Sequence, residues 1–372
     1  MKFTIDRSAL LRALGHVQSV VERRNTIPIL SNVLIKVENN QLSLATTDMD
    51  LEINESVAAS VEKQGSITAP AHTLHDIVKK LPDEEKVEIE VNESGNNMQV
   101  KAGRSNFRLS CLPVADFPAL GVGELPVEFA VSASDLRDII DRTRFAMSTE
   151  ETRYYLNGIY LHAAEKDGVE VLRAVATDGH RLAMFDMALP ENAANMPAVI
   201  VPRKTIGELR KLIEDAADTV QISLSESKIR FAFDHVVVTS KLIDGTFPDY
   251  KRVIPEGNDK LVEIDPRVFS DAIDRVSTIS DGKSRAVKIN LNGKGMTLSA
   301  NSQESGSATE DIEVKSESPD IEIGFNARYL LDITQQIKSD GCQMRMADSN
   351  KAAIIQDTSD QSSLFVLMPL RV

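Results

Sequence analysis

A short strand followed at once by an amphipathic helix occurs six times in this chain, and this repeat constrains the fold more than any other feature. The strand-like segments that lead into apolar residues at helical spacing lie at 2–6, 66–70, 128–131, 199–202, 261–264 and 321–325. The segments between them alternate apolar and polar residues with period two and end in short turns, as antiparallel hairpins do. Each third of the chain holds two such pairs and is long enough to bury its own core. The sequence therefore predicts an α+β protein of three similar domains, each with two helices packed on antiparallel sheet.

Segments that contain proline and glycine separate the three repeats, at residues 112–126 and 247–255. Such a composition is typical of linkers. We therefore expect domains at residues 1–120, 128–247 and 250–372.

The cysteines and the apolar segments indicate a cytoplasmic globular protein. Cys111 and Cys342 are far apart and form no metal-binding or disulfide pattern, which fits a reducing cytosol. No apolar run reaches the roughly 18 residues of a membrane span. The first residues are strand-like and lack the apolar core of a signal peptide. We expect cytoplasmic localisation and no contact with a membrane.

The charges are unevenly distributed, and this matters for nucleic-acid binding. The net charge of −14 argues against such binding if the charge is spread evenly. Basic residues such as Arg7, Arg137 and Arg203, however, stand between the apolar positions of the predicted helices, whereas many acids lie in strands and loops. Two interpretations are open: solvated helix faces with mixed ion pairs, or one basic layer facing phosphates behind an acidic exterior. With no Trp and no base-stacking pattern, any DNA contact would be to the backbone.

A short segment near the middle of the chain, residues 177–182, contains Asp178 and His180. These are two members of a catalytic triad, but no serine or cysteine nucleophile motif accompanies them. The segment fits a turn whose aspartate caps backbone amides. It also fits a surface docking site in which Leu182 forms part of an apolar wall.

Asp48, Asp50 and Glu52 resemble a metal-binding cluster. Their alternation with apolar residues is, however, typical of a half-exposed strand. None of the common phosphate-binding, zinc-binding or hydrolase motifs occurs, and the six histidines form no pair four residues apart. The sequence therefore predicts no catalytic residue, no metal site and no cofactor.

The last residues are apolar where a solvated terminus is usual. A strand at 363–367 is expected to finish the last sheet. Beyond it, Met368, Pro369 and Leu370 either cover another surface or are covered by a partner, and methionine suits an adaptable docking surface.

Eight segments, in order along the whole chain, carry a resemblance to a known family. They are IPIL at 27–30, GRS at 103–105, ADFP at 115–118, RYYLNG at 153–158, TDGHRL at 177–182, VPRK at 201–204, FPDY at 247–250 and VLMPLR at 366–371. Together they make the chain similar to the bacterial sliding clamps, the beta subunits of DNA polymerase III. The resemblance implies a DNA-clamp fold that closes into a ring as a head-to-tail homodimer, with helices lining the hole. A ring can be acidic overall while its inner helices are basic, and retention by topology lets it slide on DNA.

The resemblance also implies a function. Members of this family are non-enzymatic processivity factors that encircle double-stranded DNA without regard to sequence and tether the replicative polymerase. The implied partners are the DNA polymerase III alpha subunit, the clamp loader, other DNA polymerases, ligase and mismatch-repair proteins. An alternative is a clamp-like scaffold protein that uses the same peptide groove without encircling DNA.

In this family a hydrophobic groove binds short peptide motifs of the partners. Carried over by matching motif, the expected lining is Leu156, Thr177, Gly179, His180, Arg181, Leu182, Pro248, Arg252, Val253, Val366, Met368, Pro369, Leu370 and Arg371. Two apolar walls and an arginine rim suit an extended peptide with an apolar anchor.

The family further implies DNA contacts and a subunit seam. The DNA contacts carried over are Arg24, His72, Glu150, Tyr154 and Tyr155. His72 stands where the family often has arginine and Glu150 where it has glutamine, and both changes weaken phosphate binding.

At the seam, the family places Phe107 and Leu109 of one subunit against Thr278 and Ile279 of the other. Phe107 and Leu109 lie on one face of their predicted strand, as a shared apolar edge requires.

Overall fold

The computed structural model describes residues 1–92, 94–121, 123–214, 218–280, 285–292, 295–316 and 320–371. Its internal contacts divide the chain into two compact units. The first unit comprises Met1–Arg137, Pro190–Pro197 and Lys204–Leu242, and the second comprises Asp138–Leu189, Ala198–Arg203 and Ile243–Val372. Within the described residues, no helix is long and apolar enough to cross a membrane.

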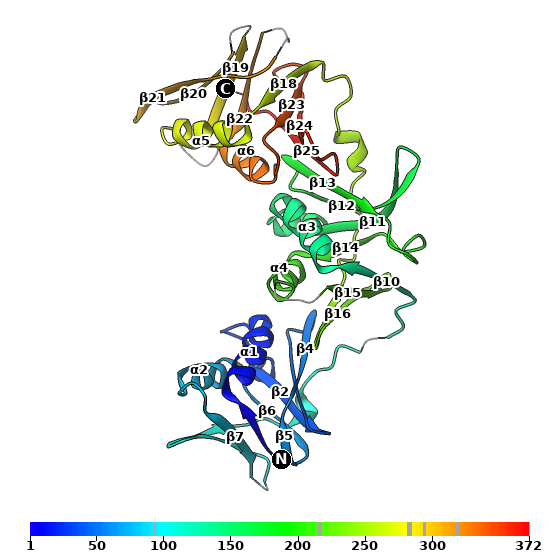
Figure 1. The fold of residues 1–372 in the computed structure, drawn as a ribbon, viewed down its shortest axis with the longest axis vertical. Helices are drawn as coiled ribbons and strands as arrows, with labels where there is room; N and C mark the ends of the chain where they lie inside the picture. The colour runs from blue at the N-terminus through cyan, green and yellow to red at the C-terminus, as the bar shows by residue number, and fades with distance from the viewer. Residues whose placement is uncertain are drawn as a thin grey trace. The chain divides into compact units, whose positions relative to one another are not determined.

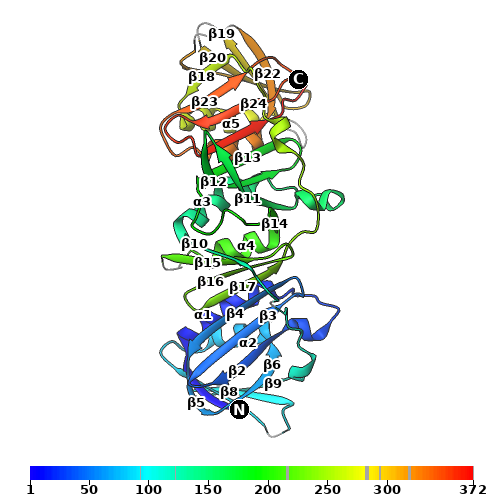
Figure 2. The same cartoon turned by 90° about the vertical axis from the view of Figure 1, so that its right-hand side faces the viewer.

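The first unit contains two antiparallel sheets. In sheet order, one consists of β5 (Ser60–Lys63), β1 (Lys2–Asp6), β7 (Lys86–Val91), β8 (Asn97–Ala102) and β9 (Ser105–Ser110). The other consists of β10 (Val127–Ser132), β15 (Thr219–Leu224), β16 (Lys228–Phe233), β17 (Val236–Lys241), β4 (Leu51–Ala58), β3 (Gln41–Thr47), β2 (Asn32–Glu38) and β6 (Gly65–Pro70). Figure 2 shows β2, β3 and β4 side by side in this sheet.

The second unit also contains two antiparallel sheets. One consists of β14 (Val199–Pro202), β11 (Gly158–Lys166), β12 (Val169–Thr177), β13 (Arg181–Ala188), β25 (Ser363–Leu367), β24 (Ala353–Asp357), β23 (Cys342–Met346) and β18 (Lys260–Ile264). The other consists of β21 (Gly306–Ile312), β20 (Gly295–Ser302), β19 (Ala286–Asn292) and β22 (Ile321–Asn326).

The described residues form six α-helices, and each directly follows a strand, as the repeat predicts. They are α1 (Arg7–Val17), α2 (Ala71–Lys80), α3 (Ala133–Thr143), α4 (Arg203–Leu212), α5 (Pro266–Ser277) and α6 (Ala327–Thr334). Short 3-10 turns are η1 (Gln18–Val20), η2 (Pro28–Ser31), η3 (Val114–Asp116), η4 (Arg144–Ala146), η5 (Glu151–Leu156) and η6 (Tyr250–Val253). Figure 1 shows α1 beside α2, and α5 beside α6, each pair on one side of its strands. The predicted α+β class is confirmed.

The start of α5 shows why the helices form where they do. Asp265 accepts hydrogen bonds from the backbone amides of Arg267 and Val268, at 2.8 and 3.1 Å, and so satisfies two amides that the helix leaves free. Pro266 occupies the first helical position, where its missing N–H does not matter. Residues such as Phe269 and Ile273 recur at helical spacing and are fully buried against the sheet.

Each unit contains one sheet that passes from one repeat into the next. In the first unit β4 pairs with β17, and in the second β13 pairs with β25. Among the residues that the structure describes, the strands β9 and β21 stand at sheet edges and are paired on one side only.

Candidate functional site

The segment 177–182 is a tight turn between β12 and β13. Asp178 Oδ1 accepts hydrogen bonds from the amides of His180 and Arg181, at 2.9 and 3.0 Å, and Thr177 Oγ1 accepts one from Gly179 at 3.1 Å. Gly179 has φ of 87°, in the left-handed region that favours glycine, and a Cβ added there would lie 2.5 Å from Arg153 Nη1, so the arginine side chain would have to move. The interpretation of Asp178 as a residue that caps backbone amides is confirmed.

Arg181 is held at the end of this turn by several partners. Its guanidinium donates to Asp178 at 3.1 Å, to Asp332 at 2.5 Å and to the Phe145 carbonyl at 2.5 Å. It also lies 4.2 Å from the centre of the Tyr329 ring. Because Arg181 is 9% exposed and fully engaged, it is a structural residue of the turn and not a free rim arginine.

An apolar cluster lies beneath the turn, on one face of the sheet. Its buried members are Leu156, Val175, Leu182, Met184, Ile200, Phe247, Tyr250, Ala352 and Val366, with Tyr155, Tyr160, Ile243, Ile254 and Leu364 packed against them. Leu156, Leu182 and Val366, which the sequence assigns to the groove, are 4%, 2% and 2% exposed. Leu182 and Val366 are direct cross-strand partners in β13 and β25. The structure thus brings these three predicted residues together as a buried floor.

Other predicted groove residues surround this cluster at the surface. Val253 and Met368 are 50% and 45% exposed, and Pro248 is also exposed. Exposed apolar side chains beside a buried apolar cluster are typical of binding surfaces. Arg252 and Arg371 are the exposed arginines of the predicted set, and Arg252 Nε donates to Asp249 at 2.9 Å.

The chain after β25 is attached at two points. The Met368 amide donates to the His180 carbonyl at 2.9 Å, and the Leu370 amide donates to the Gly324 carbonyl at 2.8 Å. Pro369 and Leu370 are half-buried. Residues 368–370 therefore run from the 177–182 turn to β22, and Met368 is the one whose side chain is most open to solvent.

A cavity of about 290 Å³ adjoins the same turn. It is lined by Met147, Ser148, Thr149, Glu150, Asp178, His180, Arg181, Arg328 and Tyr329. The His180 ring stacks on Tyr329, with ring centres 6.4 Å apart. Two of the predicted groove residues, His180 and Arg181, thus line an open space beside the apolar cluster.

Sequence reasoning missed part of the floor. Phe247 stacks on Tyr160, with ring centres 4.7 Å apart and planes at 4°, and Tyr250 is 5% exposed in the same cluster. Both residues belong to the segment interpreted as a linker. Two aromatic residues inside a proline-containing linker were the available signal, because exposed linkers rarely carry them.

The first repeat contains a turn with the same hydrogen bonds. The Met49 amide donates to Thr47 Oγ1 at 3.0 Å, and Asp48 Oδ1 accepts from the amides of Asp50 and Leu51 at 3.0 and 2.8 Å. The expectation that Asp48 and Asp50 lie in a strand is therefore wrong, since β4 begins at Leu51. The Asp48 side-chain oxygens replace ladder hydrogen bonds, which favours the turn.

The acids of this first turn have their own partners. Asp48 pairs with Lys204, and Asp50 pairs with Lys241 at 2.9 Å. Glu52 accepts from the Leu120 amide at 3.0 Å. No group of three potential metal ligands occurs among the described residues.

The turns at residues 47–52 and 177–182 differ in the residue that ends them, which is Glu52 in the first and Leu182 in the second. Glu52 lies opposite Thr239 in the β4–β17 pair, at the position that Leu182 and Val366 share in the β13–β25 pair. The half-buried Glu52 carboxylate needs polar partners, so this position in the first unit does not contribute to an apolar floor. Of the two equivalent positions, only the one in the second unit is apolar.

The predicted DNA contacts lie in different environments. In the first unit Arg24 is exposed, whereas both ring nitrogens of His72 already have partners, Gln18 Oε1 at 3.2 Å and the Val21 carbonyl at 2.8 Å.

In the second unit, Tyr154 is 53% exposed, whereas Tyr155 packs against the apolar cluster. Glu150 accepts hydrogen bonds from Arg153 at 2.5 and 2.7 Å, and these hold the pKa of Glu150 below its usual value. The negative charge of Glu150 is therefore balanced locally.

The predicted seam residues lie on the edge strand β9 and just after helix α5. Phe107 is 37% exposed on the edge strand β9, and Leu109, on the same face, is 9% exposed. Thr278 and Ile279 directly follow α5, where Thr278 is exposed and Ile279 half-buried.

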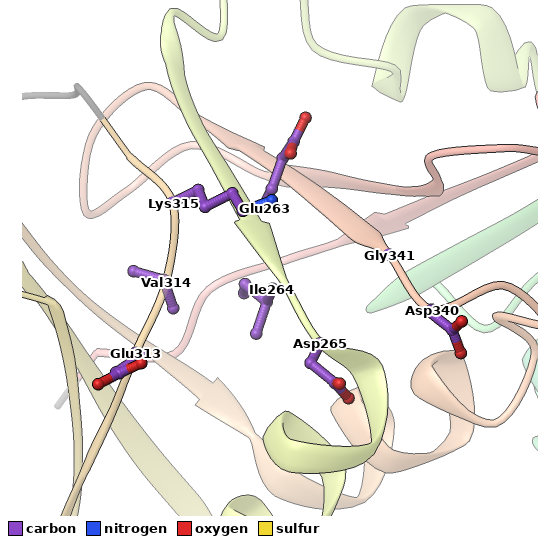
Figure 3. A pocket seen from close by; sticks show the side chains of 8 residues that line it. All are labelled: Glu263, Ile264, Asp265, Glu313, Val314, Lys315, Asp340 and Gly341. Atoms are coloured by element: carbon purple, nitrogen blue, oxygen red, sulfur yellow. The ribbon is translucent and has the colours of Figure 1, made fainter.

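A separate cavity of about 350 Å³ lies along β18 and is lined by none of the predicted residues. Figure 3 shows its acidic side chains, Glu263, Asp265, Glu313 and Asp340, pointing in different directions. The backbones of Glu263 and Lys315 exchange hydrogen bonds of 2.9 and 3.0 Å, which covers part of the β18 edge.

Comparison with known proteins places these features in a family. The models of the N-terminal, central and C-terminal domains of the DNA polymerase III beta subunit match residues 1–121, 130–249 and 251–371. The beta sliding clamp of Caulobacter vibrioides is 51% identical over 372 residues, and that of Escherichia coli K12 is 37% identical over 373 residues, each covering all of both chains.

Solved structures of sliding clamps are also similar to this chain. A sliding clamp (DNA polymerase III subunit beta) from Bartonella birtlesii bound to griselimycin is 51% identical, with a TM-score of 0.97 and complete coverage of both chains. A beta sliding clamp from Caulobacter crescentus is also 51% identical, with a TM-score of 0.98, covering 100% of this chain and 99% of that one.

Proposed function

Because the chain belongs to the DNA polymerase III beta subunit family of sliding clamps, we propose that two copies close head to tail into a ring that encircles duplex DNA. The family relation makes the chain a DNA sliding clamp. The alternative of a scaffold that does not encircle DNA gains no support, since the matched relatives are sliding clamps.

The observation that carries the ring is the repeated pairing of strands between successive repeats. In the first unit Val238 of β17 lies opposite Ile53 of β4, and in the second Phe365 of β25 lies opposite Ala183 of β13. Phe107 is the third residue of β9, and Val238 is the third residue of β17. Both strands follow a two-residue turn, so Phe107 and Val238 occupy equivalent places. The strand β21 occupies the place of β4 and β13 in its own repeat.

A third junction of this kind would join β9 to β21, but within one chain both strands are sheet edges. In a dimer, β9 of one copy can pair with β21 of the other copy, and the reverse pairing can form at the second junction. Charges at the two edges are complementary, with Arg104 and Arg108 at β9 and Glu304 and Glu310 at β21.

The same junction brings the predicted seam residues together. Phe107 presents an exposed apolar ring at β9, and Ile279 follows the helix whose Arg275 pairs with Glu310 of β21 at 2.6 Å. An apolar contact of Phe107 and Leu109 with Thr278 and Ile279 of the partner subunit would bury this surface.

Contacts with DNA follow from the ring and need not be strong. Arg24 and Tyr154 are the proposed backbone contacts with exposed side chains, whereas His72, Glu150 and Tyr155 would have to exchange present contacts for a phosphate. Because a closed ring is held by topology, weak contacts independent of sequence are sufficient and allow sliding.

The apolar cluster and its exposed rim are the proposed docking site for partner peptides. A buried floor of Leu156, Leu182 and Val366 beside exposed Val253 and Met368 suits an extended segment with apolar anchors. We propose that the DNA polymerase III alpha subunit, the clamp loader, other DNA polymerases, ligase and mismatch-repair proteins bind here, in the cytoplasm. Tethering raises their local concentration at the primer end, so the clamp itself needs no catalytic activity.

Retention on circular DNA tests the ring. The protein is loaded on a nicked circle by the clamp loader and ATP, and the circle is then cut with a restriction enzyme. We expect slow loss from the intact circle and rapid loss after cutting. Equal retention on both forms would mean ordinary phosphate binding and would overturn the encircling function.

A further inference from the structure

One face of the β11–β12–β13 sheet is divided into an apolar part and a polar part. The apolar part is the cluster described above, in which Val175 lies opposite Met184. Two residues along β12 from Val175, Arg173 lies opposite both His162 and Asp186, so these three side chains share the same face. Arg173 and Asp186 are 7% and 5% exposed, so a charged pair is buried directly beside the proposed peptide floor.

Arg173 and Asp186 form a two-pronged ion pair. Arg173 Nε donates to Asp186 Oδ1 at 2.6 Å, and Nη2 donates to Oδ2 at 2.9 Å. Such paired hydrogen bonds hold the guanidinium in one orientation. Its remaining nitrogen, Nη1, lies 3.3 Å from the Tyr250 hydroxyl.

Donors and acceptors can be assigned for the hydrogen bonds that link Arg173, Tyr250 and His162. A guanidinium only donates, so the Tyr250 hydroxyl accepts from Arg173 and offers its own proton to His162 Nε2, 3.2 Å away. His162 Nδ1 lies 2.7 Å from the Ala163 carbonyl, an acceptor, and therefore carries the ring proton. This assignment of donors and acceptors corresponds to neutral His162 with Nε2 unprotonated.

Tyr250 joins the two parts of the face. Its ring is in the apolar cluster and its hydroxyl is in the polar part. It also begins η6 (Tyr250–Val253), which carries the exposed rim residues Arg252 and Val253, and Pro248 stands two residues before it. The Tyr250 hydroxyl therefore connects this wall of the site to the polar part of the sheet face.

We propose that Arg173, Asp186 and His162 are positioning residues for peptide binding, which hold the Tyr250 hydroxyl and thereby set the wall formed by residues 247–253. The inference rests on the proposed peptide site. It adds a dependence on pH, because protonation of His162 at Nε2 removes the acceptor for Tyr250. The groups that face His162 are Arg173, Asp186, Tyr160, Tyr250 and Lys251, and burial, followed by the Arg173 and Lys251 charges, lowers the pKa of His162.

The test measures the dissociation constant of the full-length protein for a fluorescent peptide by anisotropy, between about pH 5 and pH 8. The probe is the tightest binder among overlapping synthetic peptides that tile the polymerase alpha subunit. Tyr250→Phe keeps the ring and removes the hydroxyl. Thr205→Val is the matched control, since it removes another buried hydroxyl contact, 2.6 Å to Ser240, in the first unit.

At neutral pH we expect Tyr250→Phe to bind the peptide roughly fivefold more weakly, the effect of about one hydrogen bond, and Thr205→Val to bind like the parent protein. His162→Gln keeps an acceptor that does not titrate, so its affinity should match the parent at neutral pH and stay constant in acid. The parent protein should lose affinity as the pH falls, and His162→Leu should bind weakly at every pH.

Each outcome has a distinct meaning. If the parent protein binds no peptide, the proposed site is wrong and this inference falls with it. If the parent binds but Tyr250→Phe binds equally well, only the positioning role is wrong. If the parent and His162→Gln show the same pH profile, His162 is not part of the mechanism. Should Tyr250→Phe prove unstable, the comparison of His162→Gln with His162→Leu still decides.

Discussion

Leu182 and Val366 lie directly opposite each other in the β13–β25 pair, although they belong to different repeats of the chain. Each is 2% exposed. The floor of the proposed peptide site is thus shared between the central and the C-terminal repeat, and neither repeat could form it alone. For this reason we expect the last strand and the residues after it to contribute to peptide binding at the proposed site.

Removal of residues 368–372 should abolish peptide binding. The deleted residues include the exposed Met368 and the Leu370 amide that is bonded to Gly324, whereas Val372 lies outside the described residues. The dimer should persist, because β9 and β21 are untouched. Peptide titration and light scattering measure the two properties, and unchanged peptide affinity would contradict the site.

Introducing a charge at the seam should produce monomers. Ile279→Asp and Phe107→Asp each place a carboxylate in the proposed apolar contact, where its desolvation is unfavourable. Val169→Asp is the control, since Val169 is 63% exposed and lies on neither edge strand. Light scattering should show monomers for the first two and a dimer for the control. A persistent dimer in both seam variants would refute the seam.

Leu182→Ala and Val253→Ala should separate stability from binding. Leu182 is buried, so its truncation should lower the free energy of unfolding by about 2–5 kcal/mol. Val253 is 50% exposed, and its truncation should change stability by less than about 0.5 kcal/mol. Both should weaken peptide binding. Urea unfolding and anisotropy give the two values, and a Val253→Ala protein with full affinity would remove Val253 from the site.

Glu150→Gln should strengthen binding to DNA. The pKa of Glu150 is lowered by its hydrogen bonds with Arg153, so the carboxylate is charged at neutral pH. The amide removes that charge and leaves Arg153 free to meet a phosphate. The slope of log affinity against log salt should steepen by roughly one contact. An unchanged slope would show that neither Glu150 nor Arg153 is near DNA.

The stability of the protein should decrease in mild acid through His162. Its pKa in the folded state is lowered, chiefly by burial, below the ordinary value of about 6.5. Below about pH 6.5 the unfolded chain therefore binds the proton first, and stability falls until the pH passes the folded pKa. Urea midpoints at several pH values, compared with those of His162→Gln, isolate this contribution. Parallel curves for the two proteins would exclude it.

The sequence alone determined the elements and their repetition. Helices such as α5 follow from apolar residues at helical spacing behind a capping Asp265, and strands such as β16 and β17 follow from alternation, because these signals are local. The turn at Asp178 could also be predicted from the sequence, because the Asp178 side chain accepts hydrogen bonds from amides only two and three residues away.

Only the tertiary structure decided which residues share a site. It showed that Arg181 is engaged by Asp332, that Tyr250 reaches Arg173, and that Glu52 replaces an apolar residue at the equivalent place in the first repeat. It also showed that Asp48 and Asp50 form a turn although their pattern alternates like a strand. These contacts join residues far apart in sequence, and their geometry depends on how strands from different repeats pair, which no local pattern encodes.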